Sequence, residues 1–212
     1  MGKITALSVQ KRNRERVNVH IDDEFAFGLA YVAAAHLYVG QELSAAEIAA
    51  LKSQDTLEKA KDSAYRLISL RPRSVSEIQQ RLQKKGYDAA VIEQVITQLT
   101  DLDFLNDASF AQYWVEQRDT FNPRSHIALR QELQQKGIAR SIIDEALTAS
   151  DEPAAARAAA EKKARQLAHY PEDEFKKKLG QFLQRRGFHY ALIKEIIDEL
   201  WASLQTSSSS PL

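Results

Sequence analysis

The chain has 212 residues, of which 44% are hydrophobic and 27% charged, and its 29 basic residues balance its 29 acidic residues. This composition is ordinary for a soluble globular protein, and a net charge of zero creates no whole-molecule field that would attract nucleic acid. The sequence has no cysteine, which excludes disulfides and thiolate chemistry. No apolar run approaches the roughly 20 residues of a membrane-spanning helix. We therefore expect a cytoplasmic protein that does not span a membrane.

The first 55 residues differ from the rest because their apolar residues alternate with polar ones. Alternation over residues 4–9, with Ile4, Ala6 and Ser8 on one face, and over residues 17–21 predicts two strands around a polar turn. Residues 24–27 are expected to form a third strand, and residues 28–39 a short apolar helix that ends near Gly40. A further helix is expected to begin at Ser44 and to run to about Lys52. A hairpin is marginally stable alone, so we expect it to pack on a helix.

The turn of the predicted hairpin is rich in basic residues: Lys11, Arg12, Arg14 and Arg16. The favoured interpretation is a solvated hairpin end. The alternative is a finger that contacts phosphate groups.

A short helix with a glycine after its end occurs three times, with the glycines Gly86, Gly137 and Gly187 spaced 51 and 50 residues apart. Glycine adopts the left-handed conformation readily, so it commonly follows the last residue of a helix. In each copy a leucine lies four residues before the glycine and an apolar residue follows it, which predicts a Schellman cap. A fixed period of this size predicts an array of similar units.

The segments around each glycine predict two further helices per unit. Thr56 is expected to cap the first helix of the first unit, and Ser74 with Glu77 has the spacing of a capping box. Asn106 or Asp107 is expected to cap the next unit. After each glycine, apolar residues at positions i, i+1, i+4 and i+5 indicate a helix with a broad buried face.

The predicted fold class is therefore mostly all-α: an elongated, curved array of three tandem three-helix repeats after a small N-terminal β-hairpin with short helices. The expected boundaries are 1–55 for the N-terminal part, 56–105, 106–152 and 153–204 for the repeats, and 205–212 for a disordered tail. Each repeat is expected to contact mainly its neighbours.

Catalytic chemistry is not indicated. The five histidines are scattered without metal-ligand spacing, and every glycine is explained by a cap or a turn. Trp114, Tyr113 and Phe110 could form a stacking platform for bases, but helical spacing favours core packing for Phe110 and Trp114. We expect no enzyme activity, no metal and no cofactor.

Basic residues recur at the caps and breaks of the repeats. The helix dipole alone favours one cation in a last turn, but two of the three caps carry a pair. Arg71, Arg73 and Arg124 lie beside helix starts, where the dipole opposes a cation. We therefore predict a basic face that contacts phosphate or an acidic protein surface. The candidate contact residues are Arg71, Arg73, Arg81, Lys84, Lys85, Arg124, Arg130, Lys136, Lys177, Arg185 and Arg186.

The sequence also resembles a known family over roughly residues 57–204. Residues 64–74 (Ala-Tyr-Arg-Leu-Ile-Ser-Leu-Arg-Pro-Arg-Ser) and 82–87 (Leu-Gln-Lys-Lys-Gly-Tyr) are similar to the first repeat of the bacterial regulatory protein family RecX. Residues 104–111 match the segment that follows it, and residues 123–125, 129–133 and 136–138 match the second repeat. The resemblance implies a non-enzymatic modulator of RecA, usually an inhibitor of its recombinase and coprotease activities, that lies along the groove of the RecA filament on DNA.

The partners that follow are the RecA filament and, weakly through phosphate, single- and double-stranded DNA. We expect a monomer. One alternative is a sequence-nonspecific DNA-binding helical repeat protein that acts without RecA, and another is a helical scaffold with no nucleic acid role. The sequence leaves open the sign and strength of the effect on RecA, the filament surface contacted and the role of the hairpin.

Overall fold

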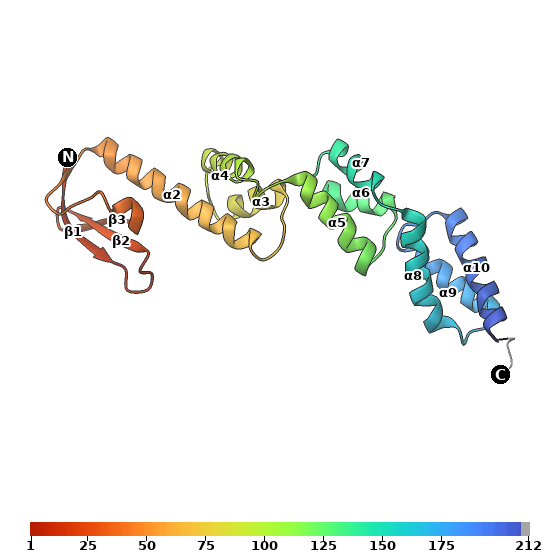
Figure 1. Cartoon of the computed structure of the whole chain (residues 1–212). Helices are drawn as coiled ribbons and strands as arrows, with labels where there is room; N and C mark the ends of the chain where they lie inside the picture. Colours follow the sequence, from red (N-terminus) through yellow and green to blue (C-terminus); the bar gives the residue numbers. More distant parts are fainter. Residues whose placement is uncertain (209–212) are drawn as a thin grey trace. The chain divides into compact units, whose positions relative to one another are not determined.

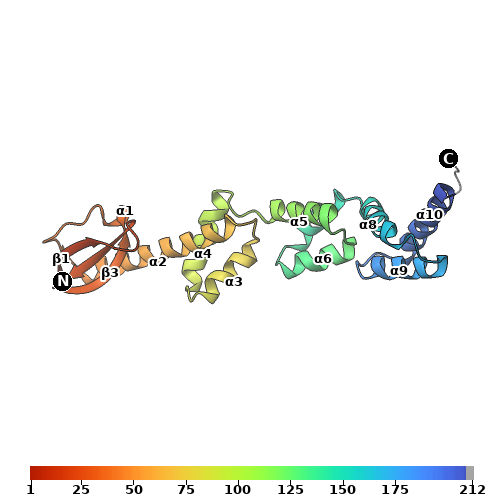
Figure 2. The same ribbon diagram turned by 90° about the horizontal axis from the view of Figure 1, so that it is seen from below.

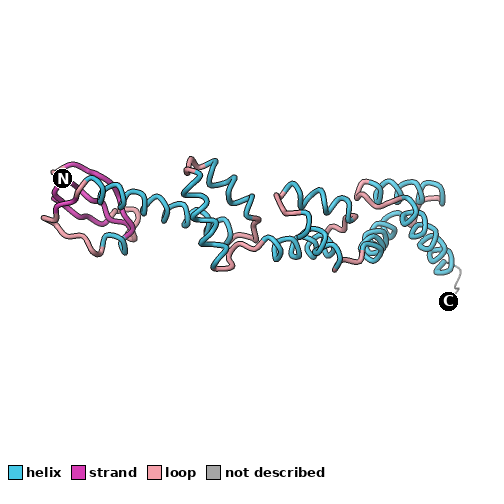
Figure 3. Tube along the Cα trace, turned by 90° about the horizontal axis from the view of Figure 1, so that it is seen from above, coloured by secondary structure: helices cyan, strands magenta, loops and turns pink. Residues whose placement is uncertain are grey.

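The computed structural model describes residues 1–208, which form a small N-terminal sheet followed by helices (Figure 1 and Figure 3). This confirms the predicted mostly helical fold class. The strands are β1 (Gly2–Val9), β2 (Arg16–Ile21), β3 (Glu24–Ala30) and β4 (Glu42–Leu43). The helices are α1 (Tyr31–Ala34), α2 (Ala45–Ile68), α3 (Val75–Lys84), α4 (Ala89–Asp101), α5 (Asp107–Phe121), α6 (His126–Gln135), α7 (Arg140–Thr148), α8 (Glu152–Leu167), α9 (Glu172–Gln184) and α10 (Tyr190–Ser208).

The chain divides into two compact units. The first unit contains residues 1–71 and 78–105, and the second contains residues 72–77 together with the chain from Asn106 onwards. The sheet and most of the first repeat belong to the first unit. The second and third repeats belong to the second unit, as does the start of α3.

The four strands of the sheet are antiparallel and have the order β3-β2-β1-β4. The hairpin of β1 and β2 confirms the prediction, but the simple alternation expected along β1 is interrupted after Ile4. A bulge between Ile4 and Ala6 shifts the register, and such a shift exchanges the two faces of a strand. Ile4 is therefore buried, whereas Ala6 is exposed and Leu7 packs against the core.

The helix predicted over residues 28–39 is mostly a strand and a loop. β3 continues to Ala30. Phe27 and Leu29, two residues apart in this strand, both point into the core and are 8% and 0% exposed. Only Tyr31–Ala34 is helical. Gly40 lies in the turn before β4, with φ of +97°, and its N–H donates to the carbonyl of Ile4 at 2.8 Å.

A single helix, α2, replaces the two helices predicted around Thr56. The predicted helix start at Ser44 is confirmed and has a capping box, since Ser44 Oγ accepts from the N–H of Glu47 at 3.2 Å and Glu47 accepts from the N–H of Ser44 at 2.7 Å. Thr56 does not cap a helix; its hydroxyl donates to the carbonyl of Lys52, four residues earlier, at 2.9 Å. Helix α2 therefore connects the sheet to the first repeat, packing on β3 and on α4 (Figure 2).

A buried carboxylate on α2 fixes the basic turn of the hairpin. Asp55 is 6% exposed and accepts from the Arg16 guanidinium at 2.7 and 3.0 Å. Arg16 also donates to the carbonyl of Gly28 at 3.0 Å, and Lys59 pairs with Asp55 at 2.7 Å. Arg16 thus has a structural role, whereas its neighbours Lys11, Arg12 and Arg14 are exposed.

Replacing Asp55 with asparagine is expected to lower the free energy of unfolding by about 2 kcal/mol, because charge-assisted hydrogen bonds contribute about 1.5–3 kcal/mol. Urea denaturation followed by circular dichroism measures the change. The matched control is Glu58→Gln, one turn away on α2, whose carboxylate is 38% exposed and pairs with Lys61. An exposed pair contributes less than about 1 kcal/mol, so similar losses in the two variants would contradict the role given to Asp55.

The three predicted glycine caps are present. The φ angles of Gly86, Gly137 and Gly187 are +85°, +78° and +89°. The first cap has both Schellman hydrogen bonds, from Tyr87 N–H to the Leu82 carbonyl at 3.3 Å and from Gly86 N–H to the Gln83 carbonyl at 2.9 Å. The same two bonds occur at Gly137 and Gly187.

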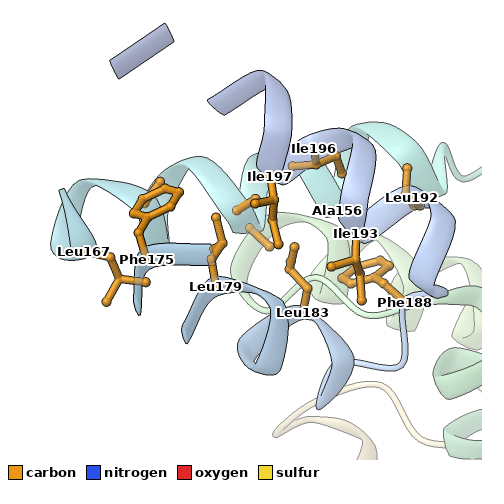
Figure 4. Close-up of a cluster of buried hydrophobic side chains, with 13 residues drawn as sticks. Ala156, Leu167, Phe175, Leu179, Leu183, Phe188, Leu192, Ile193, Ile196 and Ile197 are labelled. Carbon is orange, nitrogen blue, oxygen red and sulfur yellow. The ribbon is translucent and has the colours of Figure 1, made fainter. Parts of the chain in front are cut away.

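Each repeat in the second unit has its own apolar core. In the third repeat, Phe175, Leu179 and Leu183 of α9 face Ile193 and Ile197 of α10 (Figure 4). In the second repeat, Phe110 is 2% exposed and stacks on Trp114 at a ring-centroid distance of 5.8 Å, which confirms core packing for both.

The predicted disordered tail is wrong over residues 205–208, since α10 continues to Ser208. The remainder of that prediction, residues 209–212, lies outside the described residues. Among the other helix starts, Asn106 caps α5 by accepting from the N–H groups of Ala108 and Ser109, both at 3.0 Å. Asp151 caps α8 by accepting from the N–H of Ala154 at 3.0 Å.

Candidate interface at the helix caps

In the second unit, the glycine cap of the second repeat seats on the first turn of α3. The Ser74 hydroxyl is fully buried, donates to the carbonyl of Lys136 at 2.7 Å and accepts from the N–H of Glu77 at 3.1 Å. The Glu77 carboxylate pairs with the Lys136 ammonium at 2.7 Å. We call this arrangement, a glycine cap seated on a serine-led helix start, the cap–serine contact.

The cap–serine contact requires glycine at its centre. A Cβ atom on Gly137 would lie 2.4 Å from the Cβ and 2.6 Å from the hydroxyl of Ser76. Real Cβ atoms do not approach other atoms so closely, and the φ of +78° already disfavours any other residue. Gly137 therefore ends its helix and also allows the close approach of the two chain segments.

A second cap–serine contact joins the third repeat to the start of α6. Ser125 is fully buried, its N–H donates to the carbonyl of Arg186 at 3.0 Å, and its hydroxyl accepts from the N–H of Ala128 at 3.1 Å. The Arg186 guanidinium donates to the Asn122 side chain and to the carbonyl of Pro123, the latter at 2.8 Å. Burial, assisted by the charge of Arg124, lowers the pKa of Arg186.

Six of the eleven predicted contact residues therefore make contacts within the chain, and the partners of four of them are as follows. Lys136 and Arg186 belong to the cap–serine contacts, Arg130 pairs with Asp144, and Arg124 lies 3.9 Å from the Glu132 carboxylate and donates to the Arg185 carbonyl at 3.4 Å. The sequence carried a signal for this, because each Pro-Arg-Ser segment precedes a matching cap glycine by a similar interval. Sequence reasoning treated Ser74 only as a helix cap and gave Ser125 no role of its own.

The first cap is different. Arg81, Lys84 and Lys85 are exposed, and none of them forms an ion pair with another described residue. No heavy atom of the described chain, beyond its immediate neighbours, lies within 4 Å of a Cβ placed on Gly86. The structure thus brings these three predicted residues together at one open helix end.

The remaining candidates are divided between the units. Arg71 and Arg73 are half-buried and take part in contacts of their own. Lys177 and Arg185 are exposed on the third repeat. That all these cations share one continuous basic face stays a prediction, because they are divided between the two units.

A groove runs beside the cap in two of the repeats. In the first repeat it lies between α3 and α4, and in the third between α9 and α10, and most of the lining positions correspond. The counterparts of Gln79, Tyr87 and Ile92 are Gly180, Phe188 and Ile193. At the equivalent place in the second repeat, the ion pair of Arg130 and Asp144 spans the two helices.

The third-repeat groove is bordered by Lys176, Lys177 and Lys194. Lys176 is held by Glu172 at 2.9 Å and Asp198 at 3.0 Å, and the hydrogen bonds to these carboxylates raise its pKa. The groove therefore offers an apolar floor and a basic rim. No group of histidine, aspartate and glutamate side chains suited to a metal ion occurs among the described residues.

Asp107, at the start of α5, connects to the same helix start as Ser74. Its carboxylate accepts from the N–H of Val75 at 2.9 Å. Burial raises the pKa of Asp107, and this outweighs the lowering by the Val75 hydrogen bond. A raised native pKa means that the stability gained from protonation is complete below the unfolded pKa of about 3.9 and is lost as pH rises through the native pKa.

Asp107→Asn is therefore expected to be at least as stable as wild type at pH 7, because asparagine keeps the acceptor oxygen without the cost of burying a charge. This advantage should shrink as the pH is lowered to about 3.5, where Asp107 is protonated. Urea midpoints at the two pH values measure the effect. The raised pKa of Asp107 would be contradicted if the stability of the variant relative to wild type were clearly lower at pH 7 than at pH 3.5.

Four family descriptions match this chain, and together they cover most of it. They are the regulatory protein RecX N-terminal domain over residues 2–44 and the first, second and third three-helix domains of RecX over residues 60–99, 106–147 and 150–197. The N-terminal sheet, which lay outside the resemblance seen in the sequence, is thus also a family domain. No described helix is long and apolar enough to cross a membrane.

Individual relatives agree with the family match. The chain is 35% identical to the regulatory protein RecX of Clostridium tetani over 207 residues, covering 94% of this chain and 95% of that protein. It is 32% identical to the regulatory protein RecX of Bacillus subtilis over 205 residues, covering 94% of this chain and 78% of that protein.

Two solved structures are also similar. A crystal structure of regulatory protein RecX has a TM-score of 0.69 and 28% identity, covering 93% of this chain and all of that one. The crystal structure of RecX from Lactobacillus salivarius has a TM-score of 0.60 and 27% identity, covering 69% of this chain and 97% of that one. With its sheet domain and its three three-helix domains all matched in order, this chain belongs to the RecX family of regulatory proteins.

Proposed function

We propose that this protein binds the RecA–DNA filament and lowers the recombinase and coprotease activities of RecA. The observation that carries the proposal is the first cap, where Arg81, Lys84 and Lys85 are exposed and without ion pairs among the described residues. Lys136 and Arg186, the counterparts of Lys85 in the other two repeats, make contacts inside the chain. Three unpaired cations at one helix end form a site for an acidic protein surface or for phosphate.

The proposed mechanism is occupancy rather than catalysis. A protein seated on the filament by its basic cap would disfavour addition of RecA subunits or exclude DNA and repressor substrates from the groove. The protein would act in the cytoplasm as a monomer and without a cofactor, contacting single- and double-stranded DNA only weakly through phosphate. The exposed cations Lys177 and Arg185 would add to the contact from the third repeat.

The test is simultaneous charge reversal of the first cap, R81E with K84E and K85E. We expect the variant to fold and to inhibit RecA ATPase on single-stranded DNA and strand exchange at least about 10-fold less well than wild type. Reversing three exposed cations at the hairpin turn, K11E with R12E and R14E, changes the net charge equally and is the control. If the cap variant inhibits as well as wild type while the control does not, the contact lies at the hairpin turn instead.

Binding to DNA without RecA distinguishes the regulator from a plain DNA-binding repeat protein. Direct phosphate binding weakens steeply as salt is raised, with a slope that reports the number of phosphates neutralised. We expect only weak, salt-sensitive binding to DNA alone and clearly tighter binding to the RecA filament. Equal affinities for naked DNA and filament at the same salt concentration would favour the DNA-binding alternative.

A further inference from the structure

The two cap–serine contacts show what a cap of this kind binds. In both, the carbonyl of the residue before the glycine accepts a hydrogen bond from a buried serine at the start of a helix, and the glycine leaves room for that serine turn. In the contact at Ser74, the side chain before the glycine also pairs with a carboxylate three residues into the helix. Each cap therefore binds a helix start that is led by a serine. In the contact at Ser74, that helix start also carries an acidic residue.

The first cap has the same parts without the ligand. It has the same left-handed glycine and the same two Schellman hydrogen bonds as the caps at Gly137 and Gly187. Lys85 occupies the position of Lys136, and its ammonium has no carboxylate partner among the described residues. No described residue fills beside Gly86 the space that Ser76 fills beside Gly137.

We infer that the first cap is an open docking site for a helix start in a partner protein. That helix start carries serine or threonine at its N-cap and glutamate or aspartate three residues later. The partner hydroxyl donates to the Lys85 carbonyl, the partner carboxylate pairs with the Lys85 ammonium, and the first turn packs against Gly86. The partner is a protein rather than nucleic acid, because DNA supplies phosphates but no such turn.

This inference rests on the proposed function, since it takes RecA as the protein that supplies the helix start. The decisive variant is Gly86→Asn. Asparagine tolerates the left-handed conformation better than other non-glycine residues, and no described atom beyond the neighbouring residues lies within 4 Å of a Cβ at this position, so the variant should fold. A docked helix start, however, would meet the new side chain as Ser76 would meet a Cβ on Gly137.

The experiment compares wild type, G86N and the charge-reversed cap (R81E with K84E and K85E) in binding to RecA filaments on single-stranded DNA, with circular dichroism to confirm folding. We expect both variants to lose at least about 10-fold in affinity. Loss in the charge-reversed variant alone would overturn the docking inference while leaving the proposed function intact. Wild-type affinity in both variants would overturn the inference and the role of the first cap together.

A cross-linking measurement gives a readout that does not depend on activity. The chain has no cysteine, so Q83C creates a unique attachment point two residues before Lys85 for a photoreactive maleimide. We expect cross-links to RecA within one turn of a serine- or threonine-led helix start, identified by mass spectrometry. Cross-links confined to DNA, or to RecA segments without such a start, would overturn the assignment. E93C, on the neighbouring helix α4 beside the groove, is the position control.

Discussion

Replacing Gly137 with alanine is expected to lower the free energy of unfolding of the second unit by about 3 kcal/mol. The left-handed conformation costs a non-glycine residue about 1–2 kcal/mol. Forcing a methyl group into a packed contact costs a further 1–3 kcal/mol or so, and here the new Cβ would lie 2.4 Å from the Cβ of Ser76. Urea denaturation followed by circular dichroism measures the total.

Gly86→Ala is the matched control, because it makes the same change in the same kind of cap. The φ angle is +85° instead of +78°, but the described chain leaves the space around the new methyl group open. Only the cost of the left-handed conformation applies, so we expect a loss of about 1–2 kcal/mol. Equal losses in the two variants would show that the cap–serine contact contributes nothing beyond the conformation of the glycine.

This comparison also shows which part of the cap the sequence could predict. The left-handed glycine follows from local signals, namely a leucine four residues earlier and an apolar residue directly after it. The seat of the glycine on a serine 61 to 63 residues away depends on the packing of one repeat on another, and no local pattern specifies that. Basic residues near a cap therefore looked alike in the sequence, although Lys136 pairs with Glu77 and Lys85 is exposed.

The errors in the fold have equally specific causes. Thr56 looked like a helix cap because its hydroxyl can accept from a backbone N–H, but in a helix the same hydroxyl can donate to the carbonyl four residues earlier. Residues 28–30 looked helical because they are apolar, whereas pairing with β2 places Leu29 inside the sheet. In both cases the surrounding structure decided between two conformations that the local sequence allows.

The start of α9 is a further case where counting from the cap glycine is informative. Twelve residues before Gly86 and Gly137 lie Ser74 and Ser125, the serines of the two cap–serine contacts. Twelve residues before Gly187 lies Phe175, which is inside α9 because that helix begins at Glu172. The N-cap of α9 is Pro171, which makes no side-chain capping hydrogen bond. At the position where the first and second repeats have a serine that binds the cap of the following repeat, the third repeat has an aromatic core residue.

Phe175→Ala is expected to lower the free energy of unfolding of the third repeat by about 3–5 kcal/mol, as is usual for a buried phenylalanine. The Phe175 side chain is fully buried, and its ring centroid lies 5.1 Å from that of Trp201. The cavity would form between α9 and α10, where Leu179 and Ile197 cannot close it without moving both helices (Figure 4).

The measurement uses the two tryptophans, one in each repeat of the second unit. In a Trp114→Phe background, fluorescence during urea denaturation reports on Trp201 and so on the third repeat alone. Phe121→Ala is the control, since that side chain is 72% exposed and its loss should cost less than about 0.5 kcal/mol. If Phe175→Ala shifted the Trp201 transition no more than Phe121→Ala, Phe175 would not be the residue that completes the third core. The same substitution in a Trp201→Phe background reports on Trp114 and so on the second repeat. If the urea transition of Trp114 shifts less than that of Trp201, the cap–serine contact at Ser125 transmits only part of the destabilisation to the second repeat.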